Sequence, residues 1–240
     1  MTSTTVDRPP SVWEDLLEIF YAPRAVFERR RETPAFGLAL IIFAVLVVGL
    51  SFAFRRMMEP VFDMEYARGM AQAMKQNPKL TPEMMAQGRA MALKFMFVGV
   101  AFYAVLAPLI LGLVLWLVGK VVGSVAQLGQ ATMVATYAMF PRVLESVLNA
   151  VQMLVLPDDS ITSRYSLTAG AGRFLDATTA NPLVLALLGR VDLFTLWVTV
   201  LLAIGIGVMG RLPRGMAVIA GVAMWLIGAL PAVWGAVKAM

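Results

Sequence analysis

The sequence contains no cysteine and no histidine among its 240 residues. Without cysteine there are neither disulfides nor thiolate metal sites. Without histidine the chain lacks the commonest general base, metal ligand and pH switch of proteins. Catalysis would therefore rest on carboxylates, Lys, Tyr, Ser or Thr alone. The sequence predicts a protein that is not an enzyme and that has no cofactor and no metal centre.

Charge is scarce too, because charged residues make up 15% of the chain and hydrophobic residues 60%. A soluble domain of this length has no place to bury so much apolar surface, whereas lipid tails solvate apolar helix faces. The net charge is +5, which on a membrane protein favours anionic lipid headgroups over nucleic acid. We therefore expect an all-α polytopic membrane helical bundle that contacts lipids and binds no nucleic acid.

Apolar runs close to the ~20 residues needed to cross a bilayer recur along the chain. The first begins only after a polar, charged lead, so residues 1–34 are expected to be a cytosolic tail before an uncleaved first span. We expect about five spans in one membrane domain over residues 35–240. They cover residues 35–54, 95–119, 141–156, 191–210 and 216–237.

The third span is unusual, because the apolar stretch from Ser124 to Leu156 contains a proline and several polar residues. As one straight helix it would be about 50 Å long, against a bilayer core of ~30 Å. Proline disfavours helix in the preceding residue and suits the first turn of a new helix. We therefore expect an interfacial or shallow helix over residues 124–140, with the deeper segment starting at Pro141. A single kinked helix is the alternative.

Two segments outside the spans carry helix signals. Ser11 and Glu14 form a capping box that predicts an amphipathic helix ending near Pro23. Between the first two spans, residues 63–94 predict a polar helical hairpin divided at Asn77-Pro78. The apolar residues of the amphipathic helix follow at i, i+3, i+4 and i+7, as Trp13, Leu16, Leu17 and Phe20.

The distribution of positive charge does not fix the orientation. With the N-terminus inside, the inner segments hold nine Lys and Arg residues and the outer segments eleven, so the positive-inside rule does not decide between the two orientations. The arginines at 29–31 favour an inner N-terminus, but Arg55 and Arg56 lie just across the first span and oppose it. Five spans would place the two ends of the chain on opposite sides.

Three short patterns resemble the bacterial branch of the Yip family, the Ypt/Rab-interacting membrane proteins. Their order and spacing cover essentially the whole chain. They are Leu16-Leu-Glu-Ile-Phe-Tyr-Ala-Pro23 with Phe27-Glu-Arg-Arg before the first span, Tyr137-Ala-Met-Phe-Pro141 at the third span, and Val191-Asp192-Leu-Phe-Thr-Leu-Trp197 at the fourth.

The resemblance implies five spans in the inner membrane of a prokaryote, with a cytosolic N-terminus and the C-terminus on the opposite side. It would break the tie that the charge count leaves. In eukaryotes the family is associated with membrane traffic and Rab-type GTPases, and those members have a cytosolic region longer than the 34 residues of this tail.

Four polar residues of the third span share one helix face at spacings i, i+3, i+7 and i+10. Polar groups at this depth face the bundle interior or water, which predicts a polar groove or ion path with Asp192 as a second carboxylate. The alternative, which we favour, is an Arg142–Glu145 pair and interhelical hydrogen bonds that only fix packing, with Arg142 snorkelling to the interface. The four residues are Arg142, Glu145, Asn149 and Gln152.

Two further features predict contacts with lipid and between helices. Trp13 with Arg29, Arg30 and Arg31 predicts an anchor that contacts lipid headgroups, and the alternative is a helix packed on the bundle. Glycines recur at spacings that let a neighbouring helix approach, either within the bundle or in a second protomer. They are Gly119, Gly123, Gly221, Gly228 and Gly235.

The leading functional hypothesis is a non-enzymatic membrane scaffold or organiser. It would act through lipids, an unknown membrane or cytosolic protein partner, and a second copy of itself. The alternative is a small-solute or ion transporter or permeability factor that uses the polar stripe. A membrane-embedded enzyme is disfavoured because no nucleophile–base pair can be assembled. The 17 methionines lack companion His or Cys residues, which disfavours metal transport.

Overall fold

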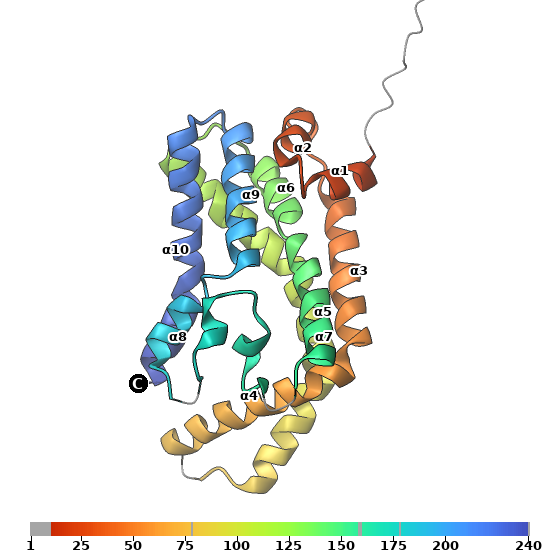
Figure 1. The fold of residues 1–240 in the computed structure, drawn as a ribbon. Coiled ribbons are helices and arrows are strands. Elements are labelled where there is room, and N and C mark those ends of the chain that lie inside the picture. The colour runs from red at the N-terminus through yellow and green to blue at the C-terminus, as the bar shows by residue number, and fades with distance from the viewer. Residues whose placement is uncertain (1–10, 78, 158–159, 178, 240) are drawn as a thin grey trace, which may run out of the picture.

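The chain folds as a bundle of helices, seen in a computed structural model. In the described part of the chain, the sole β feature is an isolated bridge between Gly170 and Asp192. Figure 1 shows the long helices side by side, with α1 and α2 at one end and α4 across the other. The predicted all-α class is confirmed. The structure describes residues 11–77, 79–157, 160–177 and 179–239.

The N-terminal segment forms two short helices, α1 (Val12–Glu18) and α2 (Pro23–Arg29), where one was expected. The predicted capping box is present: Glu14 N donates to Ser11 Oγ at 3.2 Å, and Ser11 N donates to Glu14 Oε2 at 2.9 Å. The second helix takes Pro23 as its first residue, which is the position that tolerates proline best.

The hairpin between the first two spans is larger than expected. α3 (Gly37–Ala53) and α4 (Arg55–Gln76) meet at an angle of 82°. α5 (Pro82–Val121) then runs unbroken for 40 residues. The expected boundary between a hairpin helix ending at residue 94 and a span starting at 95 is wrong, because residues 83–107 contain no proline that would interrupt the helix there.

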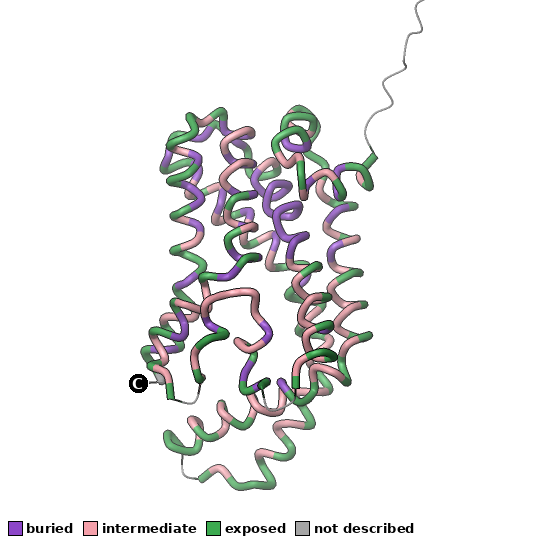
Figure 2. The backbone as a smooth tube through the Cα atoms, viewed as in Figure 1, coloured by how far each residue is buried: buried purple, intermediate pink, exposed green. Residues whose placement is uncertain are grey.

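The third segment is a broken helix made of α6 (Leu128–Ala138) and α7 (Pro141–Val155). Figure 2 shows α6 as the most continuously buried element, and every residue from Ala131 to Pro141 is buried. α6 packs between α5 and α9. The small side chains of α6 let both neighbours pack against it, so it is an internal helix of the bundle. The expectation that residues 124–140 lie at a shallow or interfacial depth stays a prediction.

The C-terminal part contains three helices after an irregular connection. This connection holds the 3₁₀ turns η2 (Arg164–Leu167) and η3 (Ala171–Phe174). α9 packs against both α6 and α10, so it lies near the centre of the bundle. The three helices are α8 (Pro182–Leu188), α9 (Leu193–Met209) and α10 (Arg214–Ala239).

Apolar side chains cover the outer faces of the long helices, as contact with lipid tails requires. Among the described helices, α5 and α10 are long and apolar enough to cross a bilayer, and the bent pair of α3 and α4 would make a third span. α9 is apolar but has 17 residues. The membrane class of the protein is confirmed, and the count of five spans stays a prediction.

Candidate functional site

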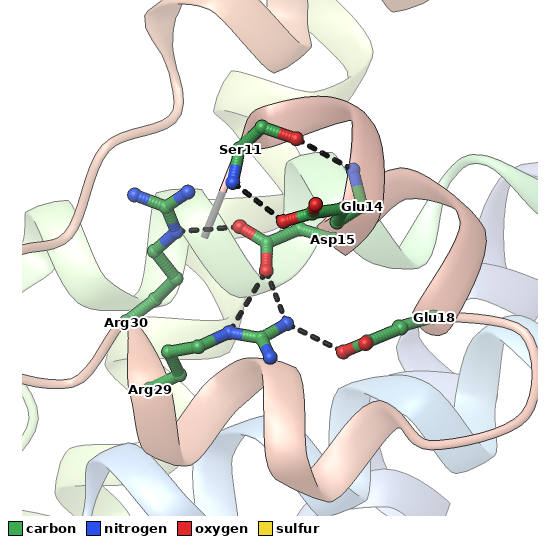
Figure 3. Close-up of polar contacts among 6 residues, drawn as sticks. All are labelled: Ser11, Glu14, Asp15, Glu18, Arg29 and Arg30. Carbon is green, nitrogen blue, oxygen red and sulfur yellow. Dashed lines mark hydrogen bonds and ion pairs between the residues drawn. The ribbon is translucent and has the colours of Figure 1, made fainter. Parts of the chain in front are cut away.

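Asp15 is the centre of an ion-pair cluster that joins α1 to α2 (Figure 3). Its completely buried side chain accepts hydrogen bonds from Arg29 Nε at 3.1 Å, from Arg29 Nη2, and from Arg30 Nε at 2.6 Å. Arg29 Nη2 also donates to Glu18 Oε2 at 2.6 Å. A buried carboxylate requires such partners, because an unpaired charge is costly to remove from water. We call residues 11–31, held by this cluster, the N-terminal cap.

The N-terminal cap is packed firmly on the helix bundle. Phe27 is fully buried in the main core. The Phe20 ring meets the Trp197 ring edge-on, with 5.7 Å between centroids. Gln130 Nε2 on α6 donates to the Arg31 carbonyl oxygen at 2.9 Å. These contacts fix the orientation of the cap relative to α6 and α9.

The side chains predicted to contact lipid headgroups divide between two roles. Trp13 is 63% exposed, in line with Leu17 at 68% and Tyr21 at 74%; we call these three residues the outer ridge. Arg29 and Arg30 instead turn inward to Asp15, so the cap has the bundle-packed character that was the alternative. Contact of Trp13 and the arginines with lipid stays a prediction.

Sequence reasoning missed Asp15, although it lies inside the predicted helix. Asp15 and Leu16 on α1 are buried, as is Ile19 just after the helix, whereas Trp13 and Leu17 are exposed. The sequence did contain a signal for this cluster. An acidic residue stands beside apolar positions of the helix, and two arginines follow 14 and 15 residues later.

The polar stripe of α7 faces a cavity of about 360 Å³ within the bundle. Arg142, Glu145 and Asn149 line this cavity, together with Arg190 from the connection between α8 and α9. Gln152 does not line it, because its side-chain amide donates to the Leu167 carbonyl oxygen at 2.7 Å. Three of the four stripe residues are therefore brought together at one site.

Arg142 is held by neighbours on two helices. Its Nη1 donates to Glu145 Oε2 at 2.6 Å, and its Nη2 donates to Thr195 Oγ1 on α9 at 2.8 Å. The expected Arg142–Glu145 pair is therefore present, and it links α7 to α9. Asn149 differs from Arg142 and Glu145, because its buried Oδ1 has no hydrogen-bond partner among the described residues.

Arg190 is the cavity residue that sequence reasoning missed. Its Nη2 donates to the Trp225 carbonyl oxygen at 3.4 Å, and Trp225 Nε1 donates to the Arg190 carbonyl oxygen at 3.3 Å. Its Nε is buried without a partner, and no ion pair to this side chain is found in the part of the chain the structure describes. The only sequence signal was a lone arginine just before an apolar run.

Asp192 does not serve as a second carboxylate of the polar stripe, so that expectation is wrong. It is the N-cap of α9, where Oδ1 accepts hydrogen bonds from the Phe194 and Thr195 backbone N–H groups at 3.0 Å each. It is buried but does not line the cavity. Aspartate is among the preferred N-cap residues because it satisfies free N–H groups of the first turn.

The remaining residues of the family-like motifs lie in the core or pack against it. Tyr137 is fully buried in α6, within electrostatic range of Asp15 at the N-terminal cap. Pro141 is buried at the first position of α7. The Trp197 ring stacks on Phe194 with 6.4 Å between centroids. Trp197 also contacts Phe20 of the cap, so it links the cap to α9.

The predicted glycine contacts are realised at three of five positions. An added Cβ would lie 3.1 Å from Ile206 Cδ1 at Gly119, 2.8 Å from Ala203 Cβ at Gly221, and 2.7 Å from Arg190 Nη2 at Gly228. Two glycines do not pack on a neighbour. Gly123 has φ +86°, so it is a left-handed turn after α5, and Gly235 has nothing within 4 Å.

Together these features define a helical membrane protein with a cavity lined partly by polar residues in its bundle and a packed cap at one end. The Yip1 domain profile matches residues 17–235, and the chain therefore belongs to the Yip1 domain family. The family resemblance inferred from the short motifs is confirmed. No curated protein matches the chain, and no solved structure matches it.

Proposed function

We propose that this Yip-family membrane protein is a non-enzymatic scaffold. It presents its N-terminal cap to anionic lipid headgroups and to a partner protein in or at the membrane, or to a second copy of itself. The observation that carries the proposal is the buried Asp15 cluster, which holds the cap in one orientation on the bundle. A segment that served only to lead into the first span would need no such cluster.

The outer ridge is the part of the cap that is suited to contact. Trp13 and Leu17 are separated by four residues on α1, so they share one face of that helix, and Tyr21 lies in the turn that follows α1. All three are mostly exposed. Aromatic side chains of this kind favour the boundary between headgroups and acyl chains. The ridge therefore offers a surface for lipid or for an apolar patch on a protein.

Site-specific photocrosslinking in cells tests the scaffold. A photoreactive residue at Leu17 should yield a reproducible lipid or protein adduct. The same residue at Glu83, exposed on the far hairpin, should not yield that adduct. Asp15→Asn should reduce the Leu17 adduct because it releases the cap. Identical adducts from both positions, or none at Leu17, would overturn the proposal.

We further propose five spans in the inner membrane of a prokaryote, with the cap in the cytosol and the C-terminus outside. The motif resemblance supports this, as does the position of the cap and the hairpin at opposite ends of the bundle (Figure 1). In intact cells without an outer membrane barrier, Lys79→Cys should react with an impermeant thiol reagent and Glu32→Cys should not. The reverse labelling would show the opposite orientation.

A second candidate function is passage of a small solute or ion, favoured by the cavity that Arg142, Glu145 and Asn149 line. In liposomes the protein should then conduct a solute, and Glu145→Gln should abolish that flux while the protein stays folded. Absence of flux together with a consistent adduct at Leu17 would leave the scaffold as the function.

A further inference from the structure

We infer that the bundle cavity is a binding site for the anionic oxygens of a ligand, a phosphate or carboxylate group, with Arg190 as the principal donor. This goes beyond the scaffold function and does not depend on transport. A phospholipid headgroup and a free small oxyanion carry the same chemistry, and the experiment below separates them.

Unused donor capacity at the cavity points to an anion. Arg142 forms an ion pair with Glu145 and donates a hydrogen bond to Thr195, so the Arg142–Glu145 pair adds no net charge. Arg190 also lines the cavity, but its Nε is buried and without a partner among the described residues. A guanidinium has five N–H donors in a fork that matches the oxygens of phosphate and carboxylate. The lining therefore has one positive charge that no lining carboxylate offsets.

Asp192, two residues from Arg190, does not remove this charge. Its carboxylate is committed to the backbone N–H groups of Phe194 and Thr195, where the positive end of the α9 dipole stabilises it. Asn149 supplies a second group for the ligand. Its side-chain amide lacks a partner at Oδ1, and the amide can turn its NH₂ group toward an anion.

The structure also holds Arg190 in place. Reciprocal hydrogen bonds join it to Trp225, and the guanidinium lies across Gly228 of α10, where a Cβ would come within 2.7 Å of Nη2. Glycine at this position therefore leaves space for the arginine head. A donor fixed in this way loses little side-chain freedom when it binds an anion.

The cavity has the size and composition of a small-molecule site. Its volume of about 360 Å³ lies within the usual range for ligand pockets. Polar groups come from α7, α9 and Arg190, whereas Phe43, Val47 and Leu111 give an apolar wall. Tyr103, which is 54% exposed, also lines the cavity, so one edge reaches the outer surface of the bundle. An oxyanion with an apolar portion satisfies both walls.

Binding to the full chain, purified and delipidated in an uncharged detergent, tests this inference. Native mass spectrometry measures retention of phosphatidylglycerol against phosphatidylcholine, and calorimetry measures binding of inorganic phosphate. We expect saturable binding of phosphatidylglycerol, of phosphate, or of both, and the ligand that binds identifies the source. Arg190→Gln should weaken that binding at least about tenfold, because it removes a charge-assisted hydrogen bond.

Matched variants separate the site from general charge and from misfolding. Arg173→Gln removes an exposed arginine that does not line the cavity and should leave binding unchanged. Asn149→Asp keeps the size of the side chain but adds a negative charge, so it should also weaken binding of the anion. This second variant keeps the test available if Arg190→Gln does not fold. Binding without flux in liposomes would refute transport and leave this inference intact. The inference is overturned if folded wild-type protein binds neither probe saturably, or if Arg190→Gln and Asn149→Asp bind as wild type does.

Discussion

Replacing Asp15 with Asn should release the N-terminal cap from the bundle. The substitution keeps the shape of the side chain but leaves Arg29 and Arg30 without their shared carboxylate. Breaking a buried ion pair on one side costs about 3–5 kcal/mol. The arginine side chains are 30% and 14% exposed, and Arg29 keeps Glu18 as a partner. We therefore take the lower end, about 3 kcal/mol.

Because the chain has no native cysteine, a single introduced thiol can measure the release of the N-terminal cap from the bundle. Val26 is completely buried in α2, and Val26→Cys is close to isosteric, so its thiol reports exposure of the cap. A cost of about 3 kcal/mol corresponds to roughly a 100-fold rise in the reaction rate with a water-soluble thiol reagent when Asp15→Asn is added. Ala220→Cys, buried on α10, should react at an unchanged rate if the effect is local.

The matched charge control is Glu28→Gln, which breaks the exposed Arg24–Glu28 pair at the other side of α2. Exposed pairs contribute about 0–1 kcal/mol, so the Val26→Cys rate should rise about fivefold at most. If Asp15→Asn raises the rate no more than Glu28→Gln does, the Asp15 cluster does not hold the cap and the reasoning fails.

Three further outcomes follow from other parts of the fold. Gly205→Ala should lower stability in detergent by about 1–3 kcal/mol through overpacking, because the added methyl group would collide with Val134. An unchanged melting temperature would contradict this prediction. Gly123→Ala should cost about 1 kcal/mol because of its positive φ, again measured by thermal unfolding, with exposed Gly235→Ala as control. The hydrogen bond from Arg89 lowers the pKa of Asp63, so the α4–α5 contact should be fully present above the ordinary carboxyl pKa of about 3.9. The contact should weaken as pH falls through the lowered pKa of Asp63. Spin labels on α4 and α5 should then report a longer distance, and Arg89→Gln should abolish this pH dependence.

The sequence allowed local features of the fold to be predicted, because those features are encoded within a few residues. The Ser11–Glu14 capping box and the start of a helix at Pro141 are both present. The burial of α6 could not be read in the same way. Its Ala, Thr and Gly residues fit a helix at the edge of the bundle as well as a central one, and only the packing of α5 and α9 decides between these positions.

The candidate site was predictable where it lies on one helix. Arg142, Glu145 and Asn149 share a face of α7, and periodicity alone brings them together. Arg190 comes from a different connection, and no local pattern shows that it reaches the same cavity. Asp15 was missed for a related reason, since its arginine partners follow 14 and 15 residues later across a turn.

The unbroken course of α5 has a mechanical consequence. Pro108 lies buried within it, and proline removes one backbone hydrogen bond, so the helix bends most easily there. The part from Pro82 to Pro108 is about 40 Å long at ~1.5 Å per residue. A swing of about 10° around Pro108 would move the hairpin end by about 7 Å. A small change in tilt at Pro108 would thus become a large displacement at the hairpin end of α5.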